Sequence, residues 1–115
     1  MTTSAPDPLS LVLTSPRPGT ARLTIDGDLD YNTADELMAA ALAALDGAEL
    51  SDLYLDCGGM GFCDSSGLAT LLRIHQRAGA AGTRLHLEKR PLVLERLLDI
   101  SGTYEYLTGA PATDT

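Results

Sequence analysis

Apolar residues occupy every second position in two stretches near the start of the chain. The first stretch runs from Leu9 to Leu13 and the second from Ala21 to Ile25. A period of two residues is typical of a β-strand with one buried face. The segment 15–19 between them holds two prolines and a glycine, which favour a turn. The short connection predicts that the two strands form an antiparallel hairpin.

Three later segments carry apolar residues at intervals of three and four, the spacing of one face of an α-helix. These segments are 34–45, 68–75 and 94–98. Thr33 and Glu36 match a capping box before the first helix, and Pro91 suits the first turn of the third. Glycines that follow the segments predict where the helices end, near Gly47, Ala78 and Gly102.

Two further stretches, 53–57 and 84–88, alternate apolar and polar residues, and 104–107 is a candidate for a short last strand. Strands that alternate with helices imply parallel neighbours joined by right-handed crossovers. Strands buried on both faces would appear as continuous apolar runs, whereas these strands alternate apolar and polar residues. We therefore predict an α/β domain with a mixed, mostly parallel sheet of four or five strands. Its helices should lie mainly on one face, opposite a wetter face.

The 115 residues have the length of one ordinary domain. We predict a flexible N-terminal arm over 1–8, the domain over 9–107 and a flexible C-terminal tail over 108–115. No apolar run approaches the length of a membrane span, and the start of the chain lacks the signature of a secretory signal. A cytoplasmic location is the resulting expectation.

The formal net charge of −8 disfavours nucleic acids and membrane surfaces as partners, because both are anionic. A basic patch on another protein is a better match. Cys57 and Cys63 do not have the spacing of a common zinc pair, and no second pair completes four ligands. We interpret both cysteines as small buried apolar residues, and we expect no bound metal or cofactor.

The segment Cys63–Leu68 lies where a strand gives way to a helix, after a predicted turn at Gly58–Gly61. The first N–H groups of a helix lack intrahelical partners, and the positive end of its dipole points outward. A serine there has two interpretations. It is an ordinary N-cap, or it is a phosphoacceptor, because a helix N-terminus also favours a phosphate.

A hydrolase is one alternative, because Ser65 on a strand-to-helix turn resembles a nucleophile elbow. However, the G-x-S-x-G motif is absent. His75 lies ten residues further along the helix, or about 15 Å away, which is too far for a catalytic pair with Ser65 or Cys63. His86 falls on another strand, where a structural role is the ordinary interpretation.

A nucleotide site and a metal site are two further alternatives. The glycine-rich segment lacks the Lys-Ser/Thr of a P-loop, and Cys63 stands where G-x-G-x-x-G needs its last glycine. Four aspartates could meet near one end of the sheet: Asp28, Asp30, Asp56 and Asp64. Without a loop motif, a solvated acidic rim is the ordinary interpretation.

Four motifs stand out along most of the chain, at Gly27–Ala34, Leu53–Asp56, Phe62–Leu68 and Leu92–Tyr104. Together they resemble the STAS domain of bacterial anti-sigma-factor antagonists, over about Leu9 to Leu107. The most specific part is the Asp-Ser-Ser-Gly-Leu run that begins at Asp64. The chain departs from the family pattern in its glycine-rich stretch at 58–61 and in Cys63, where the family usually has a plain apolar residue.

The resemblance implies a protein that binds an anti-sigma factor, itself a serine kinase, and so releases a sigma factor and regulates transcription. The kinase would phosphorylate Ser65 and break the complex, and a metal-dependent phosphatase would restore it. The implied site residues are Asp28, Asp30, Thr33, Asp64, Ser65, Ser66 and Gly67. The first three map to a partner-facing loop beside the serine turn. The resemblance implies no enzyme activity.

Two other functions stay open at this point. One is a STAS subunit of a transporter or of a stress-signalling assembly. The other, from a different class, is a small nucleotide-binding or hydrolytic protein.

Overall fold

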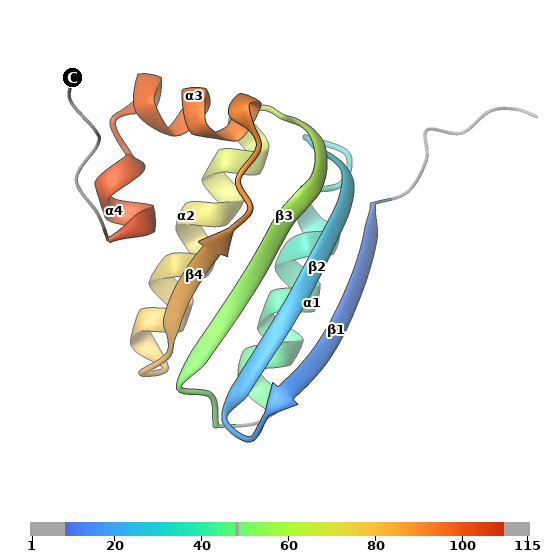
Figure 1. Ribbon diagram of the computed structural model, residues 1–115, viewed down its shortest axis with the longest axis vertical. Coiled ribbons are helices and arrows are strands. Elements are labelled where there is room, and N and C mark those ends of the chain that lie inside the picture. Colours follow the sequence, from blue (N-terminus) through green and yellow to red (C-terminus); the bar gives the residue numbers. More distant parts are fainter. Residues whose placement is uncertain (1–8, 48, 110–115) are drawn as a thin grey trace, which may run out of the picture.

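The computed structural model describes residues 9–47 and 49–109, in which strands and helices alternate along the chain (Figure 1). The elements are β1 (Ser10–Arg17), β2 (Thr20–Leu29), α1 (Ala34–Gly47), β3 (Asp52–Cys63), α2 (Ser65–Ala80), β4 (Arg84–Glu88), α3 (Leu92–Ser101) and α4 (Tyr104–Thr108). The predicted arm at 1–8 and residues 110–115 of the predicted tail lie outside the described residues. Thr108, at the start of that tail, is the last residue of α4.

The four strands form one sheet in the order β1-β2-β3-β4. β1 pairs antiparallel with β2, whereas β2 with β3 and β3 with β4 are parallel. Both the predicted hairpin and the predicted mixed, mostly parallel sheet are therefore confirmed, with four strands.

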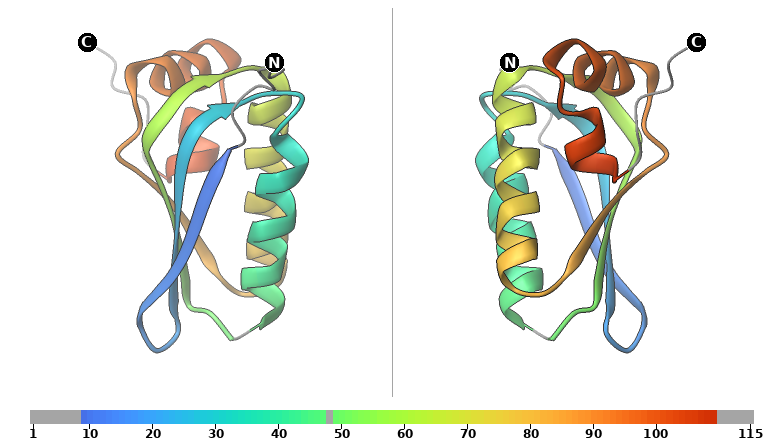
Figure 2. Two further views of the ribbon diagram at one scale, coloured as in Figure 1. Left: turned by 90° about the vertical axis from the view of Figure 1, so that its right-hand side faces the viewer. Right: turned by 90° about the vertical axis from the view of Figure 1, so that its left-hand side faces the viewer.

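Helices α1 and α2 lie side by side on one face of the sheet (Figure 2). Leu37 of α1 and Leu71 of α2 are fully buried, as are Leu23 and Leu55 of the central strands. Leucine side chains from both layers therefore fill the core, where each contributes about 1.5–3 kcal/mol by leaving water. The prediction that helices cover mainly one face is confirmed.

The opposite face of the sheet carries polar and charged side chains. Arg22 of β2 reaches across to Glu88 of β4, with 2.7 Å between Nη1 and Oε1. His86 stacks on Tyr54 at 4.5 Å between ring centroids, and its Nε2 lies 2.8 Å from Oδ1 of Asp52. This hydrogen bond holds the pKa of Asp52 below its usual value. The sheet thus has the wetter face that the alternating pattern predicts.

The predicted turn at Gly58–Gly61 is wrong, because these residues continue β3 beside β2. Gly59 pairs with Asp26, and the register shifts between Thr24 and Asp26 and again between Gly27 and Asp28. A Cβ atom at Gly61 would lie 2.7 Å from Oδ1 of Asp28. The glycines therefore leave room for aspartate side chains of β2 within an extended strand.

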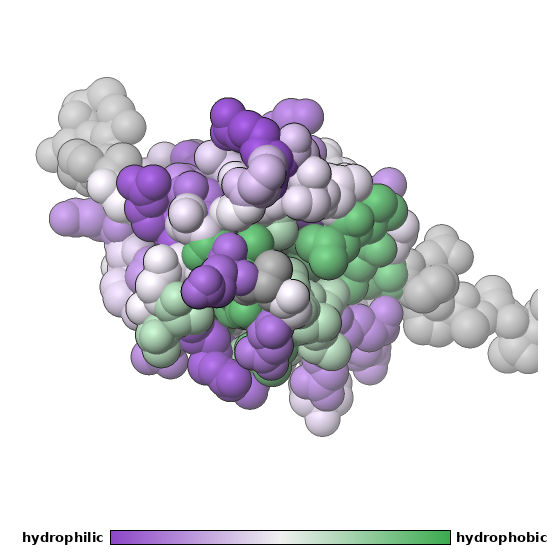
Figure 3. Space-filling view, turned by 90° about the horizontal axis from the view of Figure 1, so that it is seen from below, coloured by the Kyte–Doolittle hydropathy of each residue, from purple (hydrophilic) through white to green (hydrophobic). Residues whose placement is uncertain are grey.

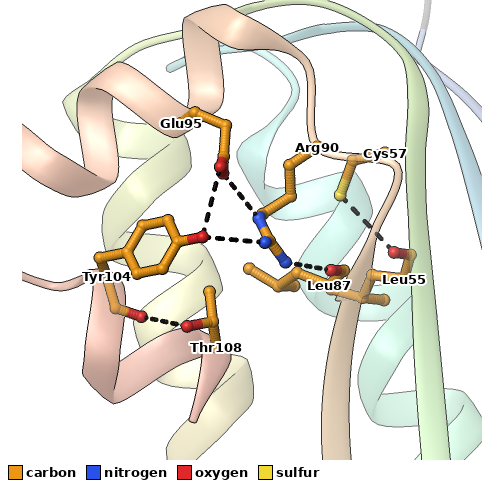
Figure 4. Close-up of polar contacts among 7 residues, drawn as sticks. All are labelled: Leu55, Cys57, Leu87, Arg90, Glu95, Tyr104 and Thr108. Carbon is orange, nitrogen blue, oxygen red and sulfur yellow. Dashed lines mark hydrogen bonds and ion pairs between the residues drawn. The ribbon is translucent and has the colours of Figure 1, made fainter. Parts of the chain in front are cut away.

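The candidate strand at 104–107 is also wrong, because Tyr104–Thr108 forms the short helix α4. Arg90, two residues after the end of β4, holds α3 and α4 in place (Figure 4). Its guanidinium donates to Oε2 of Glu95 on α3 at 2.9 Å, to the hydroxyl of Tyr104 at 3.1 Å and to the carbonyl of Leu87 at 2.6 Å. These tertiary contacts outweigh the strand-like alternation of the sequence.

Candidate functional site

The loop after β2 and the loop after β3 meet at one end of the sheet. The backbone N–H of Asp64 donates to the carbonyl of Leu29 at 3.2 Å. The backbone N–H of Tyr31 donates to Oδ2 of Asp64, also at 3.2 Å. Parallel strands bring their carboxyl ends to the same edge, so the N-termini of α1 and α2 lie beside each other there.

Asp64 is the N-cap of α2, so a serine is not the cap. It has extended backbone angles, and its Oδ1 accepts a hydrogen bond from the N–H of Gly67 at 2.9 Å. One carboxylate therefore caps α2 with Oδ1 and fixes the β2–α1 loop with Oδ2. An acidic group at this position also interacts favourably with the helix dipole.

Ser65 is the first residue of α2 and is exposed. Within the part of the chain that the structure describes, its hydroxyl has no hydrogen-bond partner. Ser66, the next residue, is half-buried and faces the groove between α1 and α2. Of the two serines, Ser65 therefore offers the freer hydroxyl.

Asp30 and Thr33 hold the β2–α1 loop together. The Thr33 hydroxyl donates to the carbonyl of Asp28 at 2.7 Å and accepts from the N–H of Asp30 at 3.0 Å. Oδ1 of Asp30 accepts from the N–H groups of Asn32 and Thr33. Because the Thr33 hydroxyl is engaged inside the loop, the predicted capping box with Glu36 does not form. The side chain of Asp28, in contrast, is exposed.

The family model for the STAS domain, described as "Mlab, STAS domain", matches residues 12–108. The chain belongs to the STAS domain family.

Solved structures of STAS proteins share this fold at low sequence identity. An anti-sigma factor antagonist from Mycobacterium paratuberculosis matches with 22% identity, TM-score 0.78 and coverage of 96% of this chain and 92% of that one. The anti-sigma factor antagonist SpoIIAA in its unphosphorylated form matches with 20% identity, TM-score 0.72 and coverage of 91% and 90%. A sulfate transporter family protein from Wolinella succinogenes matches with 22% identity, TM-score 0.68 and coverage of 84% and 76%.

Gly67 allows α2 of this STAS domain to pack closely against the end of β2. A Cβ atom there would lie 2.7 Å from the carbonyl oxygen of Leu29 and 2.9 Å from Sγ of Cys63. The position is buried. Gly67 therefore acts on the site through the backbone, by letting the helix start where Asp64 can reach both loops.

Two aromatic residues at the same end were not among the predicted site residues. Tyr31 is 80% exposed and Phe62 is 48% exposed. Their signal in the sequence is their position, directly beside the Asp30 and Cys63-Asp64 motifs. Tyrosine and phenylalanine are enriched where proteins bind other proteins, so both side chains extend the candidate surface.

A groove of about 480 Å³ opens between the first turns of α1 and α2. Its lining is Tyr31, Asn32, Ala34, Asp35, Ser66, Ala69, Thr70 and Arg73. The groove brings Ser66, Asp35 and Arg73 close to the exposed Tyr31.

Both cysteines are buried, and both histidines lie against tyrosine rings. Burial raises the pKa of Cys57 and of Cys63 to about 12, so both stay as thiols at neutral pH, as predicted for small buried residues. His75 lies against the ring of Tyr106 at 4.3 Å, and His86 lies on the outer face of the sheet.

Over residues 9–47 and 49–109, no helix is long and apolar enough to cross a membrane.

Proposed function

We propose that this STAS domain is an anti-sigma-factor antagonist whose binding is switched by phosphorylation of Ser65. The observation that carries the proposal is the hydroxyl of Ser65 at the start of α2, beside the Asp64 cap: it is exposed and has no hydrogen-bond partner among the described residues. The partner is an anti-sigma factor with serine-kinase activity, and its capture frees a sigma factor. A metal-dependent serine phosphatase reverses the modification. The chain acts in the cytoplasm, is not itself an enzyme, and binds neither nucleic acid nor membrane.

The position of Ser65 explains how a phosphate would act. A phosphoserine adds a charge of about −1.5 to −2. The helix N-terminus tolerates that charge, so the fold is retained. A partner docked on the neutral hydroxyl would instead meet a new charge, in addition to the carboxylates of Asp64 and Asp28. The expected effect is loss of the complex without unfolding.

The structural relatives support a switch of this kind. The chain resembles SpoIIAA in its unphosphorylated form with TM-score 0.72 and in its phosphorylated form with TM-score 0.68, at 20% and 21% identity. One fold thus accommodates both states of that protein. In this chain, the same fold would change its surface charge while keeping its shape.

A phosphorylation assay tests the assignment of the acceptor. The protein is incubated with the cognate anti-sigma factor and ATP, and the modified peptide is mapped by mass spectrometry. We expect phosphate on Ser65. Modification of Ser66 or Thr70 with Ser65 unmodified would overturn the assignment.

A binding assay tests the switch itself. Ser65→Asp should weaken binding of the anti-sigma factor, because it places a charge where the partner docks, whereas Ser65→Ala should bind and resist modification. Ser51→Asp is the matched control, because Ser51 is exposed and lies at the opposite end of β3. Binding of Ser65→Asp as tight as that of the control would contradict the switch.

A second candidate function is a STAS subunit of a transporter assembly. The similarity to the sulfate transporter family protein from Wolinella succinogenes favours it, at 22% identity and TM-score 0.68. Pull-down with the purified chain separates the two candidates. Capture of a membrane transporter component, with no kinase-type anti-sigma factor, would favour the second.

A further inference from the structure

The groove between the first turns of α1 and α2 continues the surface around Ser65. It begins at Ser66, the next residue, and it is also lined by Tyr31, whose backbone N–H donates to the Asp64 cap. Along α2 the lining follows positions 66, 69, 70 and 73, which share one side of the helix. The surface next to Ser65 therefore extends along α2 for about two turns.

The groove contains two charged side chains, Asp35 of α1 and Arg73 of α2. Both residues are exposed, and neither side chain forms an ion pair within the described parts of the chain. Arg22 and Arg90, in contrast, are paired with carboxylates of this chain. Because the guanidinium of Arg73 has no such pair, it is available to a carboxylate of another molecule.

The size of a protein interface brings Arg73 within reach of a partner docked on Ser65. A specific interface covers about 800 Å² on each partner, which corresponds to a round patch of about 16 Å radius. In α2, Arg73 follows Ser65 at about 12 Å along the helix axis, and Arg77 follows at about 18 Å. A patch centred on Ser65 therefore includes Arg73 and stops short of Arg77.

The opposite end of the molecule has a groove without charge. Figure 3 shows this end from below, with hydrophobic side chains gathered beside hydrophilic ones. The groove at the C-terminal end of α1 has a volume of about 300 Å³, and its lining, which includes Leu13 and Ala44, holds no charged residue. It cannot select a partner by charge, whereas the groove beside Ser65 can.

Arg73 is an exception to the acidic character of its own end of the molecule. The chain carries a net charge of −8, and Asp28, Asp35 and Asp64 all lie at that end. Such a surface attracts a basic partner. A uniformly basic partner would, however, place a like charge against Arg73, so the matching partner has a carboxylate there.

We propose that Arg73 is a specificity-determining residue for the anti-sigma factor. Its guanidinium donates hydrogen bonds to an acidic side chain that the partner inserts into the groove beside Ser65. This inference rests on the function proposed above, because it takes the anti-sigma factor as the occupant. It adds the chemistry by which this chain distinguishes its own partner from other basic surfaces.

Charge reversal separates such a contact from general attraction. Arg73→Glu and Arg77→Glu each change the net charge from −8 to −10, because a positive charge is lost and a negative one is gained. General attraction of a basic partner would make both variants bind more tightly. If a carboxylate lies against position 73, Arg73→Glu should instead bind about five- to thirtyfold more weakly, mainly through faster dissociation. Arg77→Glu should bind at least as tightly as the parent.

The anti-sigma factor in this experiment is the one that phosphorylates Ser65 in the assay described above. Equal affinities of Arg73→Glu and Arg77→Glu overturn the proposal. Ser65→Asp, measured in parallel, distinguishes this proposal from the switch. Weak binding of Ser65→Asp with tight binding of Arg73→Glu contradicts the role of Arg73 alone, whereas tight binding of Ser65→Asp contradicts the switch.

Chemical modification of the parent chain tests the contact without a substitution. Phenylglyoxal modifies accessible arginines, and both Arg73 and Arg77 are exposed in the free chain. In the complex with the anti-sigma factor, peptide mass spectrometry should find Arg73 protected and Arg77 still modified. Modification of Arg73 at the same rate in the free and the bound chain would overturn the proposal, because a guanidinium paired with the partner would be shielded.

Discussion

The carboxylate of Asp64 has a larger structural role than the serine that follows it. Its Oδ1 accepts from Gly67 at the start of α2, and its Oδ2 accepts from Tyr31 in the neighbouring loop. Ser65 has neither role, although the sequence alone made a serine cap the ordinary interpretation. A short side chain with two acceptor oxygens can satisfy both loops only because they meet at this edge of the sheet.

Substituting Asp64 and Ser65 in turn should distinguish the residue that caps α2 from the proposed phosphoacceptor. Asp64→Ala removes a cap and a bond between loops, so we expect a loss of about 1–2 kcal/mol in the free energy of unfolding. Ser65→Ala changes an exposed side chain that has no partner in the described part of the chain, and it should stay within about 0.5 kcal/mol of the parent. Urea unfolding measures both. A larger loss for Ser65→Ala than for Asp64→Ala would assign the cap to the serine.

Gly67 and Gly79 lie in the same helix, and a methyl group has different consequences at each. Gly67→Ala places a Cβ 2.7 Å from the Leu29 carbonyl oxygen and should cost about 1–3 kcal/mol, because that backbone must shift. Gly79→Ala meets nothing within 4 Å and should be neutral or stabilise by up to about 1 kcal/mol. Thermal unfolding compares them. Similar melting temperatures for the two variants would show that α2 does not need the close approach.

At the scale of elements, hydrophobic periodicity predicted most of the strands and helices. The prediction was wrong in two segments, 58–61 and 104–107. The glycines at 58–61 resemble a turn in sequence, but their lack of side chains gives space to Asp26 and Asp28 within β3. Tyr104–Leu107 alternates like a strand, yet Leu107 is buried and Arg90 binds Tyr104, which stabilises a helix. Neither contact can be read from local sequence, because each partner lies more than ten residues away.

The hydroxyl of Tyr104 should be needed to hold α4 against the rest of the fold. Tyr104→Phe removes its bonds to Arg90 at 3.1 Å and Glu95 at 3.4 Å and should cost about 1 kcal/mol. Amide hydrogen exchange should rise in α4 more than in α1. Tyr106→Phe is the control, because no hydrogen bond of its hydroxyl is found in the described chain. Equal exchange in the two variants would contradict this role of Arg90.

At the scale of the whole molecule, parallel topology brings most of the predicted site to one end of the sheet. The sequence located these residues because strand order fixes which loops are neighbours. The hydrogen bonds of the individual side chains depend on the folded geometry, which local sequence does not give. Asp30 and Thr33 bond within their own loop, while Asp28 remains exposed. The sequence did not identify Tyr31 and Phe62 as surface residues of the site, because their exposure depends on how the two loops pack.

Asp28 is therefore the residue whose charge should act on the partner from a distance. A complementary charge at an interface raises the rate of association more than the residence time. We expect Asp28→Asn to slow association with the anti-sigma factor and to reduce its salt dependence. The dissociation rate and the free energy of unfolding should change little, because the carboxylate has no hydrogen bond in the described chain. Asp30→Asn is less suitable, because Oδ1 of Asp30 holds the loop.

Asp46→Asn provides the matched control for this experiment. It removes the same charge from an exposed position near the other end of α1, a helix of 14 residues. That helix is about 21 Å long, which exceeds the screening length of about 8 Å at physiological salt. A charge on Asp46 should therefore have little influence on a partner docking at the serine loop. Stopped-flow binding across a salt series measures both variants, and equal salt slopes would place the interface away from the Asp28 loop.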